Sequence, residues 1–216
     1  MADLAKIRRD MVRNHIVARG VRSERVVEAM EKVPREAFLP EHYQEFAYED
    51  SPLPIDEGQT ISQPYIVALM TELLELKGSE KVLEVGTGSG YQAAVLSQIA
   101  REVYTIEIIP SLAERAKETL ARLGYSNAWV KTGDGFFGWE EKGPFDAILV
   151  TASAQKIPEP LWHQLREEGR LVMPLGREHQ SQKLVRVRKI AGRRHVENIT
   201  GVIFVPMTGA AQKGAR

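Results

Sequence analysis

Between residues 81 and 175, short apolar runs alternate with segments in which apolar residues recur every three or four positions. The runs have the length of buried strands, and the segments between them have the period of amphipathic helices. The predicted strands are VLEV at 82–85, VYTI at 103–106, AWV at 128–130, AILV at 147–150 and LVMPL at 171–175. Alternation of this kind is typical of a parallel sheet whose two faces are covered by helices. We therefore predict an α/β fold.

The residues on either side of this core follow other patterns. Apolar spacing predicts two amphipathic helices in residues 1–33, broken near Gly20, and the prolines that follow predict an irregular loop. Ser62 has the character of a helix N-cap, so a helix is expected from Ser62 to Gly78. At the other end, KLVRVRKI and ENITGVIFVPM flank a turn at Gly192 and predict an antiparallel hairpin. The residues from Gly209 onward are expected to fray.

A glycine-rich turn joins the first predicted strand to the helix after it. Gly86, Gly88 and Gly90 stand in VLEVGTGSG, where glycine lets the backbone turn sharply and approach a ligand closely. A dinucleotide fingerprint would need its third glycine at position 91, which is Tyr91. The spacing therefore disfavours NAD as the ligand.

Two acidic residues follow the next two predicted strands. Glu107 comes 21 residues after Gly86, where its carboxylate can accept hydrogen bonds from both ribose hydroxyls of a nucleoside. Asp134, in the sequence GDG, can accept a hydrogen bond from an adenine amino group. Because the carboxyl ends of parallel strands share one edge of the sheet, these residues predict a nucleoside site there. The alternatives are a plain turn for the glycines and a cap or a solvated charge for either acid.

Composition excludes several other classes of function. The chain has no cysteine, so disulfides, thiolate metal sites and cysteine nucleophiles are all absent, and its five histidines lack metal-ligand spacing. Lys plus Arg and Asp plus Glu number 29 each, so no overall charge favours binding to nucleic acid or to anionic membranes. We find neither a membrane-spanning stretch nor a secretory signal, and we expect a cytoplasmic protein.

The motifs resemble those of known enzymes at two levels. EVGTGSG, Glu107, GDG and LREEGRLVMPLG resemble, in order and spacing, class I S-adenosylmethionine-dependent methyltransferases. MVRNHIVARGV, VPREAFLP, YEDSPLPIDEGQTISQP, VKTGDGFFGW, FDAILVTASA and GVIFVPMTG resemble the protein-L-isoaspartate (D-aspartate) O-methyltransferase family over nearly the whole chain. This resemblance implies one Rossmann-like domain with a mostly parallel seven-stranded sheet. Its expected parts are a helical segment with the substrate loop (1–78), a cofactor-binding core (79–176) and a hairpin with the tail (177–216).

The resemblance also implies an activity and a site. The methyl group of S-adenosylmethionine would pass to the free α-carboxylate of an isoaspartyl residue in a damaged protein or peptide, which starts repair through a succinimide. Ser62 would be the catalytic residue and would orient the carboxylate; a helix cap is the alternative for its hydroxyl. The expected cofactor-binding residues are Gln59, Thr60, Ser62, Gly86, Thr87, Gly88, Glu107, Asp134, Gly135 and Thr208. Neither a metal nor a nucleic acid is implied, and we expect a monomer.

Several alternatives stay open from sequence. A class I O-methyltransferase for a small molecule has the same cofactor motifs, and a module that binds the nucleoside without catalysis would share them too. Phe136, Phe137 and Trp139 beside GDG would either line the adenine pocket or pack in the core. The order of the last strands is also undetermined.

Overall fold

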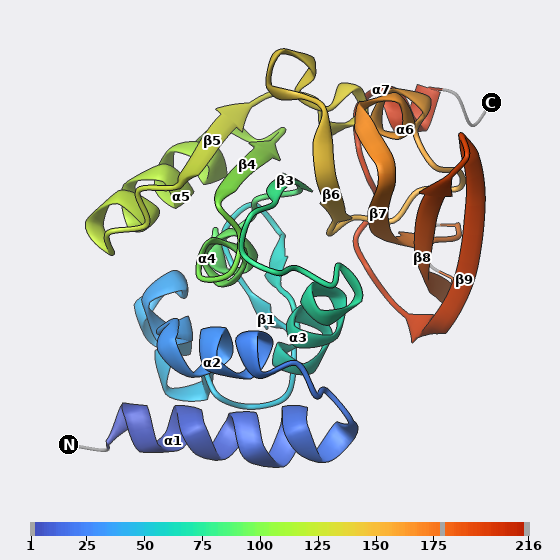
Figure 1. Cartoon of the computed structure of the whole chain (residues 1–216). Helices are drawn as coiled ribbons and strands as arrows, with labels where there is room; N and C mark the ends of the chain where they lie inside the picture. The colour runs from blue at the N-terminus through green and yellow to red at the C-terminus, as the bar shows by residue number, and fades with distance from the viewer. Residues whose placement is uncertain (1–2, 178–179, 214–216) are drawn as a thin grey trace.

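The computed structural model describes residues 3–177 and 180–213. Its centre is a seven-stranded sheet in the order β5-β4-β3-β6-β7-β8-β9. The first five of these strands in that order run parallel, and β8 and β9 are antiparallel to their neighbours. Figure 1 shows β5 at one edge and the β8–β9 hairpin at the other. The α/β fold, the mostly parallel sheet and the hairpin are thus confirmed.

The strands lie close to their predicted places. The bounds are β3 Lys81–Val85, β4 Glu102–Glu107, β5 Ala128–Thr132, β6 Phe145–Val150, β7 Leu165–Leu175, β8 Gln182–Ile190 and β9 Arg193–Val202. β7 begins six residues before the predicted LVMPL run, because Leu165 already pairs with Phe145 of β6; the register shifts before the next pair, Arg170 with Ala147. Ala191 and Gly192, both with positive φ, form the tight turn of the hairpin.

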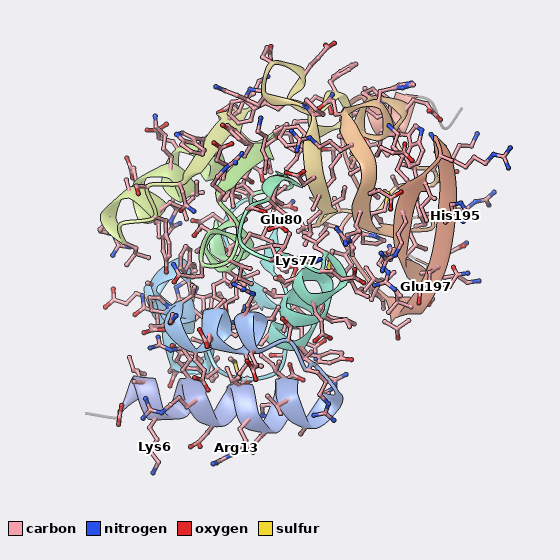
Figure 2. The ribbon with its side chains drawn as sticks, viewed as in Figure 1. Lys6, Arg13, Lys77, Glu80, His195 and Glu197 are labelled. Atoms are coloured by element: carbon pink, nitrogen blue, oxygen red, sulfur yellow. The ribbon has the colours of Figure 1, made fainter. Side chains whose placement is uncertain are left out.

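The amino-terminal segment is helical, as predicted. α1 (Leu4–Met11) continues as a π-helical and then a 3₁₀ turn up to Gly20, whose left-handed conformation ends it, and α2 follows at Glu24–Lys32. Figure 2 shows Lys6 and Arg13 on the outer face of this first helical stretch, pointing away from the molecule. The predicted break near Gly20 is confirmed.

The region expected to be an irregular loop contains regular structure. Two 3₁₀ helices, Arg35–Phe38 and Glu41–Phe46, precede a small antiparallel hairpin of β1 (Leu53–Pro54) and β2 (Thr60–Ile61). At two residues each, these strands are too short to produce an alternating pattern in the sequence.

The predicted start of the next helix is wrong by two residues. α3 spans Pro64–Leu73, its N-cap is Gln63, and Pro64 takes the first turn. Because proline restricts the preceding residue to extended backbone, the helix cannot include Gln63, and Ser62 lies outside the cap position. The capping role considered for Ser62 is therefore not observed.

Three further helices connect strands of the sheet, namely α4 Tyr91–Ser97, α5 Pro110–Arg122 and α6 Glu159–Gln164, and α7 Ala210–Lys213 follows β9. The short helix α6 was not predicted. The residues from Gly209 onward were expected to fray, but the structure shows α7 there. Residues 214–216 lie outside the described part of the chain. The strand predicted over ENITGVIFVPM ends at Val202, and residues 203–207 continue as extended chain with one bridge, Ser153 to Pro206.

Two clusters of buried side chains cover the two faces of the sheet. One combines the amino-terminal segment from Met11 to Leu76 with α4 and α5 and with sheet residues such as Val82. The other joins α6 and sheet residues such as Leu83, and Phe136 and Trp139 pack against it. Among the described residues, no helix is long and apolar enough to cross a membrane.

Candidate active site

The site lies where the strand order of the sheet reverses. β3 is the first strand of the parallel sheet, with β4 on one side and β6 on the other, so the connections diverge at its carboxyl end. Open α/β sheets bind ligands at such a switch point. A cavity is present there, and nine of the ten expected cofactor residues line it: Gln59, Thr60, Ser62, Gly86, Thr87, Gly88, Glu107, Gly135 and Thr208.

The glycine turn forms the floor of this cavity. The backbone N–H groups of Gly86 and Thr87 both donate to the carbonyl of Ile106 on β4, at 2.9 and 3.2 Å. Gly86 has a φ of 95°, and a Cβ there would lie 2.4 Å from the hydroxyl oxygen of Thr151. Only glycine fits at this position, both for its backbone conformation and for the close neighbour.

Glu107 ends β4 with its carboxylate at the cavity wall. One oxygen accepts the N–H of Gly88 at 2.8 Å and the other accepts the N–H of Ile109 at 3.0 Å. A carboxylate oxygen has two lone pairs, so each oxygen keeps one for a further donor. The residue is buried, which makes those free acceptor sites costly unless a ligand or a water molecule uses them.

Asp134 is the expected residue that does not line the cavity. Its carboxylate accepts the N–H of Phe136 at 2.9 Å and the N–H of Ala210 at 2.8 Å, so it connects the GDG loop to the start of α7. The next residue, Gly135, does reach the cavity. Phe136 and Trp139 belong to the apolar packing of the sheet, which fits the core interpretation, whereas Phe137 is 58% exposed.

Ser62 lies between β2 and α3 and lines the same cavity as Glu107. Gln59 and Thr60 of the β1–β2 hairpin line it as well. Within the described part of the chain, the Ser62 hydroxyl has no hydrogen-bond partner of its own. It is therefore available to a ligand, and no structural role competes for it.

Further residues line the cavity that the sequence did not predict. Thr151 and Ala152, just after β6, and Val205, Pro206 and Met207, just after β9, also line the cavity. The motifs FDAILVTASA and GVIFVPMTG contain these residues, but nothing in their composition marks them as ligand contacts. Position was the available signal for Thr151, because it follows the strand next to the switch point.

A buried acid lies beneath the glycine turn. Glu84, on β3, is fully buried, and neither of its oxygens has a hydrogen-bond partner among the described residues. Burial raises the pKa of Glu84 from 4.5 to about 8; the nearby Thr105 side chain opposes this rise and the charge of Glu107 adds to it. Glu84 therefore keeps its proton to a higher pH than an ordinary glutamate.

A Rossmann-like sheet with a glycine turn after β3 and an acid at the end of β4, both lining one cavity at the switch point, is the architecture of a class I methyltransferase. A family model described as protein-L-isoaspartate(D-aspartate) O-methyltransferase matches residues 6–212. The chain belongs to this family.

Individual relatives agree with this assignment. Protein-L-isoaspartate O-methyltransferase 2 of Shewanella sediminis is 56% identical over 208 residues, which cover 96% of this chain and 85% of the relative. A solved protein-L-isoaspartate O-methyltransferase superposes with a TM-score of 0.86 at 31% identity, covering 94% of this chain and 67% of the other. A Plasmodium falciparum structure, described as a candidate enzyme of this kind in complex with S-adenosyl-L-homocysteine, has a TM-score of 0.79 at 28% identity, with 93% and 98% coverage.

Proposed function

We propose that this chain is a protein-L-isoaspartate O-methyltransferase. It transfers a methyl group from S-adenosylmethionine to the free α-carboxylate of L-isoaspartyl residues in damaged proteins and peptides. The observation that carries the proposal is that one cavity is lined by Ser62, the glycine turn and Glu107 together, and that the Ser62 hydroxyl has no partner among the described residues. Formation of the methyl ester would then start repair, because the neighbouring backbone nitrogen can displace it to close a succinimide.

The residues present fit the adenosyl cofactor. Glu107 has one free lone pair on each carboxylate oxygen, which matches the two hydroxyls of a ribose. Gly86 has no side chain that could clash with Thr151, so the glycine turn can pack directly against the loop after β6. We assign Gly86, Thr87 and Gly88 to the amino-acid end of the cofactor.

The adenine end belongs to other residues in this proposal. Gly135 and Asp134 would contact the base, with Asp134 using the lone pairs that its bonds to Phe136 and Ala210 leave free. Thr208, Gln59 and Thr60 complete the enclosure.

The chemistry requires positioning and little else. The bound cofactor supplies a methyl group activated by a sulfonium charge. A carboxylate with an ordinary pKa near 3.5 is already ionised at pH 7, so the protein needs no general base. Alignment of the carboxylate oxygen with the methyl carbon can contribute about 7 to 11 kcal/mol. Ser62 would donate its hydroxyl hydrogen to one carboxylate oxygen and so fix which lone pair faces the methyl group.

Further parts of the proposal concern the setting. We infer a cytoplasmic monomer that acts on polypeptides and not on nucleic acid. The balanced charge of the chain, 29 basic and 29 acidic residues, supports the last point. It also fits an enzyme whose substrates have no common charge.

The decisive experiment compares initial methylation rates on one peptide in its aspartyl and isoaspartyl forms, with radioactive S-adenosylmethionine. We expect incorporation into the isoaspartyl form alone, and inhibition by S-adenosylhomocysteine. Equal rates on both forms would contradict the proposal. Labelling of a small metabolite with no labelling of either peptide would favour the small-molecule alternative, and cofactor binding without any turnover would favour a binding module.

A further inference from the structure

Thr151 connects the two strands that flank the switch point. It follows β6 directly, and its backbone N–H donates to the carbonyl of Val85 at the end of β3, at 2.9 Å. Its hydroxyl oxygen lies 2.6 Å from the carbonyl oxygen of Gly86 and 3.1 Å from that of Val85. One hydroxyl hydrogen serves one acceptor well, and the shorter contact identifies Gly86 as that acceptor.

These bonds hold the glycine turn from both sides. On the β4 side, Ile106 accepts the N–H of Gly86 at 2.9 Å, and on the β6 side Thr151 binds the Gly86 carbonyl. Both polar backbone groups of Gly86 are therefore satisfied by neighbouring strands. The Thr151 hydroxyl is the side-chain contact among these bonds, so a mutation can remove it without altering the backbone ladder.

The loop that begins at Thr151 also binds the segment after β9 that lines the cavity. The N–H of Ser153 donates to the carbonyl of Val205, and the N–H of Met207 donates to the carbonyl of Ser153, both at 2.8 Å. Outside this loop, Gln182 holds the same segment by two bonds to the backbone of Phe204, at 2.7 and 3.1 Å. The extended chain after β9 therefore takes its position partly from the loop after β6.

We propose that Thr151 is a positioning residue that sets the distance between the glycine turn and the Val205–Met207 segment. The inference rests on the proposed function, in which the turn holds the methyl donor and the acceptor lies in the same cavity. Thr151 does not act on the reacting atoms, because its hydroxyl hydrogen is already donated to Gly86. Loss of the hydroxyl would let the turn and the loop shift independently, so both cofactor binding and alignment would suffer.

The test uses two substitutions that separate the hydroxyl of Thr151 from its methyl group. Thr151→Val replaces the hydroxyl with a methyl group, and Thr151→Ser keeps it. Calorimetry with S-adenosylhomocysteine and steady-state kinetics with an isoaspartyl peptide at saturating cofactor would be measured for each. We expect Thr151→Val to weaken binding at least fivefold and to lower kcat at least fivefold. Thr151→Ser should stay within twofold of the natural chain in both.

A matched control separates positioning from general destabilisation. Ser97, buried on α4 and outside the cavity lining, donates its hydroxyl to the carbonyl of Ala94 at 2.7 Å, a bond of the same kind. We expect Ser97→Ala to lower thermal stability while leaving affinity and kcat within twofold. If Thr151→Val does not fold, Thr151→Ala provides the same readout with a smaller side chain.

Two results would overturn the proposal: natural affinity and kcat in the folded variant that lacks the hydroxyl, or losses in Thr151→Ser as large as those in Thr151→Val. The calorimetric measurement of S-adenosylhomocysteine binding needs no peptide substrate. Failure of the natural chain to methylate the isoaspartyl peptide would therefore count against the proposed function, whereas the calorimetric comparison would still decide the role of Thr151.

Discussion

At the scale of single residues, Ser62 shows how the structure narrows two interpretations to one. The sequence allows a helix cap or a substrate contact, since a serine two residues before a proline fits either. The helix uses Gln63 as its cap, and the Ser62 hydroxyl lies free at the cavity. The fold therefore does not depend on this hydroxyl.

Substitution of Ser62 should then affect turnover alone. We expect Ser62→Ala to lower the methylation rate of an isoaspartyl peptide at least tenfold, with S-adenosylhomocysteine affinity nearly unchanged. Because no cap is lost, the free energy of unfolding should change by less than about 0.5 kcal/mol. Kinetics, calorimetry and urea unfolding check the three parts. A loss of stability near 1 kcal/mol together with unchanged turnover would restore the capping interpretation.

The raised pKa of Glu84 predicts how the stability of the folded state changes with pH. Its folded pKa of about 8 exceeds the ordinary value of 4.5, so the folded state keeps a proton that the unfolded chain releases between these values. Unfolding therefore releases a proton in this range, and this group makes the folded state less stable as pH rises from 4.5 to 8. The slope approaches about 1.4 kcal/mol per pH unit.

The neutral variant Glu84→Gln isolates this contribution. All other groups titrate alike in both proteins, so we expect the stability difference between them to move in favour of Gln as pH rises from 5.5 to 7.5. Urea unfolding at three pH values measures it. A difference that stays constant with pH would mean that the Glu84 carboxyl is ionised in the folded state and has a partner.

Sequence reasoning worked for those site residues whose place follows from a strand end. The Gly86 turn and Glu107 come directly after apolar runs, so their position at one edge of the sheet could be predicted from the sequence. Thr151 and Val205 are 54 residues apart, and their loops meet only because β7, β8 and β9 bring the chain back. Asp134 was predicted at the correct edge of the sheet. Its contact with Ala210 could not be predicted, because α7 has no periodic apolar pattern in the sequence.

At the scale of elements, the β1–β2 hairpin lines the cavity but has little backbone pairing of its own. It pairs over two residues, and its tip has positive φ at Glu57 and Gly58. Two polar contacts attach the tip to α5: Asp56 forms an ion pair with Arg115, and the Ser111 hydroxyl donates to Glu57 at 2.8 Å. These contacts are exposed, so each contributes at most about 1 kcal/mol.

Removing both contacts should speed release of the product. We expect the double variant Ser111→Ala, Arg115→Gln to release S-adenosylhomocysteine two- to tenfold faster, because the hairpin must move aside for a ligand that its residues Gln59 and Thr60 enclose. Stopped-flow displacement measures this rate. Arg122→Gln on the same helix is the control, since Arg122 forms no ion pair among the described residues. Equal release rates in all three proteins would indicate that the ligand leaves by another route.

The elements that sequence reasoning missed share a physical cause. β1, β2 and α6 are too short for a period to be recognised, and their shape comes from tertiary contacts. The first half of β7 is polar because its residues after Leu165 are largely exposed, so the signal of a buried strand starts only at Leu171. The long apolar strands and helices of the core were predicted correctly because their burial determines their sequence.

At the scale of the whole molecule, the amino-terminal segment and the sheet share one core. Arg35 is fully buried where this segment packs against α4. Its guanidinium donates to the carbonyls of Ala47 and Ser51, at 2.8 and 3.3 Å, and lies 5.1 Å from the ring centre of Tyr91, which lines the cavity. Burial lowers the pKa of Arg35 to about 10, so it stays charged at neutral pH. We propose on these grounds that residues 1–216 form a single domain whose parts do not fold separately.

This proposal predicts one cooperative unfolding transition, observed with two probes that report on different parts. The tryptophans Trp129, Trp139 and Trp162 all belong to the sheet half, whereas far-UV circular dichroism also reports on the helices before residue 74. We expect both signals to change at the same urea concentration. S-adenosylhomocysteine at 100 times its Kd should stabilise both by about 2.7 kcal/mol, because the ligand binds only the assembled cavity. An earlier dichroism transition that the ligand does not shift would separate the helical segment from the core, and the cavity would then have to bind its ligand without Gln59, Thr60 and Ser62.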